Sequence, residues 1–260
     1  MSAHHVRRPV LAGNWKMNRG PREAMSFFDT FLARYRPHDD RTVLFFPPAI
    51  SFAAAARATV DRPDIALGVQ NVHWEQSGAF TGEIAAAMAA EAGARYVLAG
   101  HSERRHIFGE TDEQVGRKAA AALAAGLIPL VCVGETLEQR RAGQLGEILL
   151  RQLAAATAPL SDDAAAMLVI AYEPVWAIGT GVNATPADAA EAHRFIRERL
   201  AQRFGQSAAD AVPILYGGSV KPDNAAELLA AEGVDGLLVG GASLDPDGFA
   251  WIAAARVASG

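Results

Sequence analysis

Residues 96–133 read YVLAGHSERRHIFGETDEQVGRKAAAALAAGLIPLVCV and contain one complete strand–helix–strand unit. The two ends of this stretch, Tyr96–Ala99 and Ile128–Val133, are apolar runs too continuous for half-exposed strands, and they resemble parallel strands buried on both faces. Between them, the capping box Thr111–Gln114 marks a helix start, and Gly126 is placed to end that helix. The stretch therefore predicts two parallel strands joined by a helix.

The same unit recurs along the whole chain. Eight apolar runs of this kind are separated by alanine-rich segments, and they lie at Val10–Ala12, Val43–Phe46, Ile65–Val69, Tyr96–Ala99, Ile128–Val133, Met167–Tyr172, Ile214–Tyr216 and Gly236–Val239. Further helix starts are indicated at Thr136–Gln139 and Thr185-Pro186, and further helix ends at Gly93 and Gly233. Eight units in 260 residues leave about 32 residues for each, the size of a strand, a helix and their connections.

No Ser/Gly-rich or Pro-rich linker and no charge block divides the chain. We therefore expect one domain over residues 1–260, of the α/β class and folded as a single closed parallel (β/α)8 barrel. An open doubly wound sheet is the alternative, but it usually has fewer strands.

Composition excludes several classes of protein. Half of the residues are hydrophobic, which argues against a disordered chain, and the single cysteine, Cys132, excludes a disulfide scaffold. A formal charge of −5 argues against nucleic acid as a partner. The longest uncharged apolar run, Ala119–Gly134, is shorter than the roughly 20 residues that span a membrane, and no export signal follows Met1–Pro9. A cytoplasmic location is therefore expected, with Cys132 reduced and buried.

Polar residues follow the apolar runs at the point where each predicted strand ends. They are Asn14, Lys16, Gln70, Asn71, His101, Ser102, Glu103, Glu135, Glu173, Gly217-Gly218-Ser219 and Gly240-Gly241. Because catalytic groups of a parallel barrel lie at the carboxyl ends of its strands, we expect these residues to surround one opening.

Two glycine pairs, Gly217-Gly218 and Gly240-Gly241, follow the last two predicted strands. Backbone N–H groups in such turns bind anions, and these two loops form the usual phosphate site of this fold. Either pair alone could be an ordinary tight turn, but two pairs in adjacent loops predict a phosphorylated ligand.

Glu173 ends the sixth apolar run, where a buried carboxylate has to be paired, solvated or functional. A general base fits this position, and a carboxylate bonded to a nearby donor at the rim is the structural alternative. The apolar segment Val175–Gly181 follows, with Trp176 and Ile178 between Pro174 and two glycines. It predicts either a lid that expels water or a loop packed on its neighbours.

His101 precedes a predicted helix start, where the helix dipole would hold its imidazole neutral; a purely structural histidine is the alternative. Lys16 is one of three lysines in an arginine-rich chain and lies beside the first strand end, where a point charge could neutralise a phosphate or an oxyanion. A solvated surface lysine is the alternative there. The remaining histidines are interpreted as structural and no metal site is predicted, because none has ligand spacing with supporting carboxylates: His4, His5, His38, His73, His106 and His193.

Five motifs together resemble the triosephosphate isomerase family. They are Gly13-Asn14-Trp15-Lys16, Ala99–Arg105, Ala171–Gly181, Tyr216–Val220 and Leu238–Leu244, and the resemblance runs from about Pro9 to Ile252. It implies a TIM barrel that interconverts dihydroxyacetone phosphate and glyceraldehyde 3-phosphate without a cofactor, a step of glycolysis and gluconeogenesis.

The resemblance also implies roles for individual residues. Glu173 would move the proton between two carbons, neutral His101 would polarise the enediolate oxygens, and Lys16 with Asn14 would stabilise their charge. These roles of base, neutral histidine and closing loop are those that the family itself exemplifies. Glu103 matches a carboxylate near the lysine. The implied phosphate contacts are Gly179, Ser219, Gly240 and Gly241.

The family is normally a homodimer, and Gln70–Glu83 resembles the loop that reaches the neighbouring subunit. Two departures stand out: the extension Met1–Arg8, and Ala85 where a serine is common. Another phosphate-binding barrel acting on a larger sugar, a non-catalytic barrel and a metal-dependent aldolase are competing interpretations. The first would have a roomier opening, the second a damaged base or electrophile, and the third a histidine cluster.

Overall fold

Eight parallel strands form a closed barrel in the computed structural model, which describes residues 8–178 and 184–255. The strands are β1 (Val10–Asn14), β2 (Thr42–Phe46), β3 (Ile65–Val69), β4 (Tyr96–Ala99), β5 (Ile128–Val133), β6 (Val169–Tyr172), β7 (Ile214–Tyr216) and β8 (Gly236–Val239). Each pairs with the next, and β1 pairs with β8 from Val10 opposite Gly236 onwards, which closes the ring. The predicted fold is confirmed.

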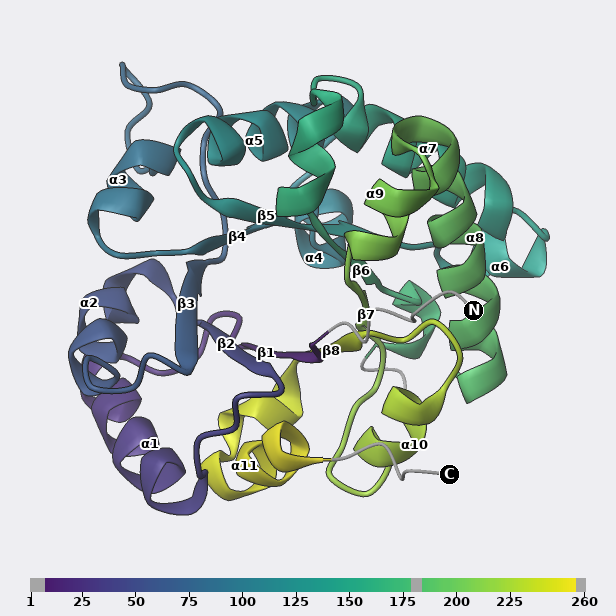
Figure 1. Cartoon of the computed structure of the whole chain (residues 1–260). Helices are drawn as coiled ribbons and strands as arrows, with labels where there is room; N and C mark the ends of the chain where they lie inside the picture. The colour runs from purple at the N-terminus through teal and green to yellow at the C-terminus, as the bar shows by residue number, and fades with distance from the viewer. Residues whose placement is uncertain (1–7, 179–183, 256–260) are drawn as a thin grey trace.

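Helices surround this ring on the outside (Figure 1). They are α1 (Pro21–Arg34), α2 (Ala49–Ala58), α3 (Ala86–Glu91), α4 (Ser102–His106), α5 (Asp112–Ala124), α6 (Leu137–Arg141), α7 (Leu145–Thr157), α8 (Pro186–Phe204), α9 (Gln206–Ala211), α10 (Ala225–Ala230) and α11 (Pro246–Ala254). Short 3₁₀ helices occupy Asp162–Met167, Val175–Ala177 and Gly241–Leu244.

The predicted helix signals lie where the sequence places them. Thr111 and Thr136 cap α5 and α6 as capping boxes, and Thr185 caps α8 ahead of its proline. Gly93 and Gly126 follow α3 and α5 with left-handed φ angles of 94° and 75°, which a glycine adopts without a steric penalty.

The sixth strand is shorter than predicted. Met167 ends the 3₁₀ helix Asp162–Met167, and the next backbone N–H, that of Leu168, donates to the carbonyl of Ala165 at 3.1 Å. That donor is therefore not available to the strand ladder, and β6 begins at Val169. The prediction of a strand from Met167 was wrong by these two residues.

Side chains alternate between the inside of the barrel and the layer beneath the helices. On β1, Val10 and Ala12 belong to the inner cluster, whereas Leu11 packs outward against the helices. Cys132 lies in the inner cluster and is fully buried, as predicted, and its burial raises the pKa of its thiol. Both faces of the strands are therefore covered by apolar side chains. Because the strands are parallel, the polar groups that follow them all lie at the same end of the barrel.

Arg41, just before β2, ties the end of the described chain to the barrel. Its guanidinium donates to the carbonyls of Ala253 and Ala255 at 3.0 and 2.7 Å, and it pairs with Asp40. Next to it, the backbone N–H of Thr42 donates to the carbonyl of Pro9. This cluster lies at the amino ends of β1 and β2, away from the polar opening.

Candidate active site

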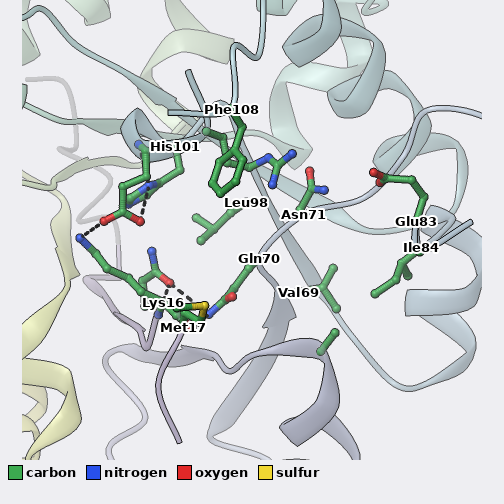
Figure 2. Close-up of a pocket in the computed structure, with 15 residues that line it drawn as sticks. Lys16, Met17, Val69, Gln70, Asn71, Glu83, Ile84, Leu98, His101 and Phe108 are labelled. Atoms are coloured by element: carbon green, nitrogen blue, oxygen red, sulfur yellow. Dashed lines mark hydrogen bonds and ion pairs between the residues drawn. The ribbon is translucent and has the colours of Figure 1, made fainter. Parts of the chain in front are cut away.

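A cavity of about 460 Å³ opens at the carboxyl ends of the strands. Its lining brings together the ends of β1, β4, β6, β7 and β8, and it includes the predicted residues Asn14, Lys16, His101, Glu173, Ser219, Gly240 and Gly241. Gly179 lies outside the described residues. Glu103 lines an adjoining cavity of about 400 Å³, drawn in Figure 2, which shares Asn14, Lys16 and His101 with the first. The expected convergence is therefore found for the described members except Ser102 and Glu135, which line neither of these two cavities.

Glu173 follows β6, and its carboxylate is held by donors on both oxygens. Oε2 accepts the backbone N–H of Ser102 at 2.9 Å, and Oε1 accepts the Ser102 hydroxyl at 3.1 Å. Oε1 also lies 3.1 Å from Nε2 of His101. The side chain is only 3% exposed, so these three contacts replace the solvation that the carboxylate has lost.

Close packing against the end of β5 fixes the position of the Glu173 backbone. The Glu173 N–H donates to the carbonyl of Val133 at 2.7 Å, and the Glu173 carbonyl lies so near Gly134 that a Cβ there would come within 1.7 Å of it. Only glycine fits at position 134. The end of β5 therefore determines the position of the carboxylate at the end of β6.

His101 is the residue that caps α4, so the predicted helix start is confirmed. Its Nδ1 accepts the backbone N–H of Glu103 at 3.3 Å, which requires an unprotonated Nδ1. Nε2 of the same ring faces the Glu173 carboxylate. This hydrogen-bond pattern leaves Nε2 as the donor that the histidine presents to the cavity.

Lys16 reaches the cavity from an unusual backbone conformation. Its φ is +52°, in the left-handed region that costs a non-glycine residue about 1–2 kcal/mol. Nζ pairs with Glu103 Oε1 at 2.5 Å (Figure 2), and a Cβ on Gly240 would lie 3.4 Å from the lysine Cε. The ammonium group therefore lies between the Glu103 carboxylate and the glycine loop after β8.

The two glycine pairs are glycine for different physical reasons. A Cβ on Gly218 would come within 2.2 Å of the Tyr216 hydroxyl, so packing requires glycine there. A Cβ on Gly240 would make only an ordinary van der Waals contact with Lys16. A Cβ on Gly241 would lie more than 4 Å from the atoms of the other described residues beyond its neighbours in the chain. The second pair leaves its backbone accessible from the cavity, which is the arrangement that an anion needs.

The sequence analysis assigned no role to Ser102 or Glu135. Ser102 bonds the Glu173 carboxylate, and its position in the first turn of α4 is the sequence signal that could have indicated this. Glu135, which follows β5, is fully buried and accepts Tyr172 Oη at 3.0 Å and Trp176 Nε1 at 2.8 Å. Burial raises the pKa of Glu135 despite these two donors.

Trp176 fits the second of the two alternatives for this segment, a loop packed on its neighbours. It is only partly exposed, bonds to Glu135 and lies 5.7 Å beneath the Arg140 guanidinium. The start of the predicted lid is therefore anchored to the barrel, with Ile178 lining the cavity. The remaining part of the predicted lid, Gly179–Gly181, lies outside the described residues.

In the described part of the chain, no cluster of three or more His, Cys, Asp or Glu side chains could hold a metal ion. Within the same residues, no helix has both the length and the apolar character needed to cross a membrane.

A closed parallel barrel with a carboxylate, an imidazole and an amine side chain at one opening, at the carboxyl ends of its strands, has the architecture of a TIM-barrel enzyme. The family model described as "Triosephosphate isomerase" matches residues 9–256. Among curated relatives, triosephosphate isomerase of Herpetosiphon aurantiacus is 52% identical over 94% of this chain and 97% of its own length. Triosephosphate isomerase of Solibacter usitatus is 49% identical over 95% of this chain and 99% of its own length.

A solved structure supports the same assignment. The crystal structure of triosephosphate isomerase from Bartonella henselae superposes with a TM-score of 0.84 and 44% identity, covering 95% of this chain and 98% of that one. This chain therefore belongs to the triosephosphate isomerase family.

Proposed function

We propose that this protein interconverts dihydroxyacetone phosphate and glyceraldehyde 3-phosphate by proton transfer, without a cofactor. The observation that carries the proposal is the contact between the Glu173 carboxylate and His101 Nε2, 3.1 Å apart, in a cavity that also receives Lys16. A carboxylate base beside a neutral donor is the pair that a shift of a proton between adjacent carbons requires. This reaction is the one that gives the family its name.

Glu173 is the base in this proposal. Its carboxylate removes a proton from the carbon next to the substrate carbonyl, the electrons move onto the carbonyl oxygen to give an enediolate, and the same carboxyl returns the proton to the neighbouring carbon. The Ser102 contacts hold the carboxylate before the substrate arrives.

His101, Lys16 and Asn14 stabilise the charge that forms on the oxygens. The Nε2–H of His101 donates a hydrogen bond to them, and the Lys16 ammonium supplies a positive charge. Glu103 positions that ammonium through their 2.5 Å ion pair. The phosphate group is bound by Ser219, Gly240, Gly241 and Gly179, of which the first three line the cavity.

Glu173→Gln tests the assignment of the base. The amide keeps the shape of the carboxyl group but cannot accept the proton, so turnover should fall by about 100- to 10,000-fold while inorganic phosphate still competes for the site. Isomerisation of glyceraldehyde 3-phosphate is followed with a coupled dehydrogenase that reads dihydroxyacetone phosphate. Glu138→Gln, an exposed carboxyl on α6, is the matched control and should keep wild-type turnover.

Each outcome of this experiment bears on a different part of the proposal. Near-normal turnover in Glu173→Gln would remove the base assignment. A folded wild-type protein that binds phosphate and does not isomerise triose phosphates would contradict the reaction itself.

We further propose a homodimer in which the loop Gln70–Glu83 of one copy enters the 400 Å³ cavity of the other. Exposed apolar side chains support this surface: Met17 and Phe108, both in the lining of that cavity, are 96% and 69% exposed. Within the loop, Phe80 is 43% exposed, and its ring lies 4.3 Å from the ring of His73 in a tilted arrangement. Apolar surface of this kind is typically covered by a partner, and a second copy carries the complementary loop.

A cytoplasmic location remains part of the proposal. The free thiol of Cys132 suits a reducing compartment. Cell fractionation with an antibody against the chain tests it, and recovery of the protein outside the cytoplasm would contradict it.

A further inference from the structure

Gln70, at the carboxyl end of β3, directs one side-chain amide nitrogen at three oxygen atoms. Nε2 lies 2.8 Å from the carbonyl of Lys16, 2.9 Å from the carbonyl of Phe46 and 3.4 Å from Oδ1 of Asn14. Because all three are acceptors, only the NH₂ end of the amide can face them. Figure 2 shows Gln70 reaching from its strand toward Lys16 and Met17.

The Lys16 backbone needs such support. Among the described residues, Lys16 and Arg19 are the two non-glycine residues with a left-handed φ, at +52° and +66°. A conformation of this kind persists where the surroundings fix it. For Lys16 the backbone is bonded at both ends: its N–H donates to Asn14 Oδ1 at 3.0 Å, and its carbonyl accepts from Gln70.

The same bonds orient Asn14. Its Oδ1 accepts the Lys16 N–H and lies within reach of the Gln70 amide. The part of the Asn14 amide that remains for a substrate oxygen is therefore its Nδ2 donor. One glutamine thus connects the β2 end, the Asn14 side chain and the backbone that carries the Lys16 ammonium.

We propose that Gln70 is a positioning residue of the active site, which holds the strained Lys16 backbone and the Asn14 amide so that the ammonium and Nδ2 donor face the substrate. Gln70 itself lines the adjoining 400 Å³ cavity and is absent from the lining of the substrate cavity. It therefore acts through Lys16 and Asn14. This inference rests on the proposed function, because it assigns a role within that reaction.

A double-mutant cycle tests the inference. Gln70→Met keeps the length of the side chain and removes its donors, so kcat/KM should fall by about 10- to 100-fold through misplacement of Lys16. In a Lys16→Ala background the same change should cost less than about threefold, because the ammonium that Gln70 positions is already gone and only the orientation of Asn14 is still affected. The cycle is repeated on the affinity for inorganic phosphate, which does not depend on turnover.

Ser51→Ala is the matched control. The Ser51 hydroxyl donates to the carbonyl of Arg19 at 2.6 Å, so it supports the other left-handed residue of the same loop. Its loss should be additive with Lys16→Ala. Circular dichroism and solution mass check that every variant is folded and assembled like the wild type.

The outcomes separate this inference from the proposed function. Wild-type protein that isomerises triose phosphates while Gln70→Met stays within about threefold of it would overturn the role of Gln70 and leave the function intact. Losses that add in the Lys16→Ala background would also overturn it. If Gln70→Met does not fold, Gln70→Glu, which has the same shape, replaces it; failure of both to fold assigns Gln70 to the fold as a whole and overturns the inference.

Discussion

Lys118 and Glu110 form an ion pair inside the molecule, with side chains only 5% and 2% exposed. Burial opposes the charge on Glu110, but the hydrogen bond and charge of Lys118, with the charge of Arg104, hold the pKa of this carboxyl below its usual value. The other Glu110 oxygen accepts the N–H of Gly100, and Lys118 also bonds Asn71 at 2.7 Å. This network joins α5 to the ends of β3 and β4.

Lys118→Met should destabilise the protein by about 3 kcal/mol, because it leaves the buried Glu110 without its main counter-charge. Chemical denaturation at fixed protein concentration measures the effect. The double variant Lys118→Met/Glu110→Gln removes both charges and should be more stable than the single one. A single variant as stable as the wild type would show that Arg104 and the Gly100 N–H are sufficient partners.

His193 on α8 provides a second buried titratable group. It is fully buried, its Nδ1 bonds the carbonyl of Gly233 at 2.9 Å, and its ring lies edge-on to Tyr172. Burial lowers the pKa of His193 to about 4, although the bond to Gly233 acts in the opposite direction. The native protein therefore keeps this ring neutral where the unfolded chain would protonate it.

This difference makes stability depend on pH. Between the usual histidine pKa of about 6.5 and the native value near 4, the unfolded state binds more protons, so stability falls as pH falls, by about 3 kcal/mol in total. His193→Asn retains a donor for Gly233 and has no group that titrates. The stability gap between wild type and this variant should therefore narrow from pH 7 to pH 4; a constant gap would contradict the role of His193.

The sequence indicates which polar residues follow the strands, but not which contacts their side chains make. Glu135 and Glu173 both follow buried strands and look alike in the sequence. In the structure, Glu135 is turned to Tyr172 and Trp176, whereas Glu173 meets Ser102 and lines the cavity. The side to which a carboxylate turns depends on the packing of neighbouring strand ends, which no local pattern encodes.

At the scale of elements, α3 begins without a side-chain cap. Ala85 holds the N-cap position with φ −72° and ψ 150°, the conformation in which a serine hydroxyl accepts a free N–H of the first turn. Ala85→Ser should therefore raise the free energy of unfolding by about 0.5–1 kcal/mol. Ala87→Ser, at an exposed position within the same helix, is the control and should lower it slightly, because serine is a poorer helix former. Thermal unfolding of the two variants decides whether the hydroxyl makes the cap.

The helices and strands themselves were largely predictable, because helix-capping residues and apolar runs are local sequence signals. The eight strands and the capping boxes at Thr111, Thr136 and Thr185 are all present. The error at Met167 has a physical reason: an apolar residue before a strand can belong to a turn, and the bond from Leu168 to Ala165 decides this. The partly buried state of Trp176 depends on Glu135 and Arg140, which are distant in sequence.

At the scale of the whole molecule, the loop Gln70–Glu83 is held in one conformation by contacts among its own side chains and with α5. His73 stacks on Trp74 and contacts the ring of Phe80 in a tilted arrangement, and the Arg117 guanidinium lies 4.4 Å from the centre of the Trp74 ring. A loop that is ordered before it meets a partner loses little conformational entropy on association. This supports the proposed dimer through such a loop.

Thr81→Arg should therefore weaken the proposed dimer, because a long charged side chain would enter the 400 Å³ cavity of the partner. The mass in solution should shift toward that of one chain, 27.4 kDa. Ser207→Arg, at an exposed position on α9, is the control and should leave the mass unchanged. A Thr81→Arg protein with the wild-type mass would contradict the interface.

Lys16 lines both cavities, one facing the substrate and the other facing the proposed partner loop. Because the two cavities share this residue, we expect the two binding events to be coupled, and coupling is reciprocal: if association increases the affinity for a phosphorylated ligand, the ligand increases the affinity of association by the same factor. Dilution, which separates the two copies, should then lower the specific activity while each chain is still folded. Cells that keep their triose phosphate pools full would, by the same linkage, hold the two subunits together.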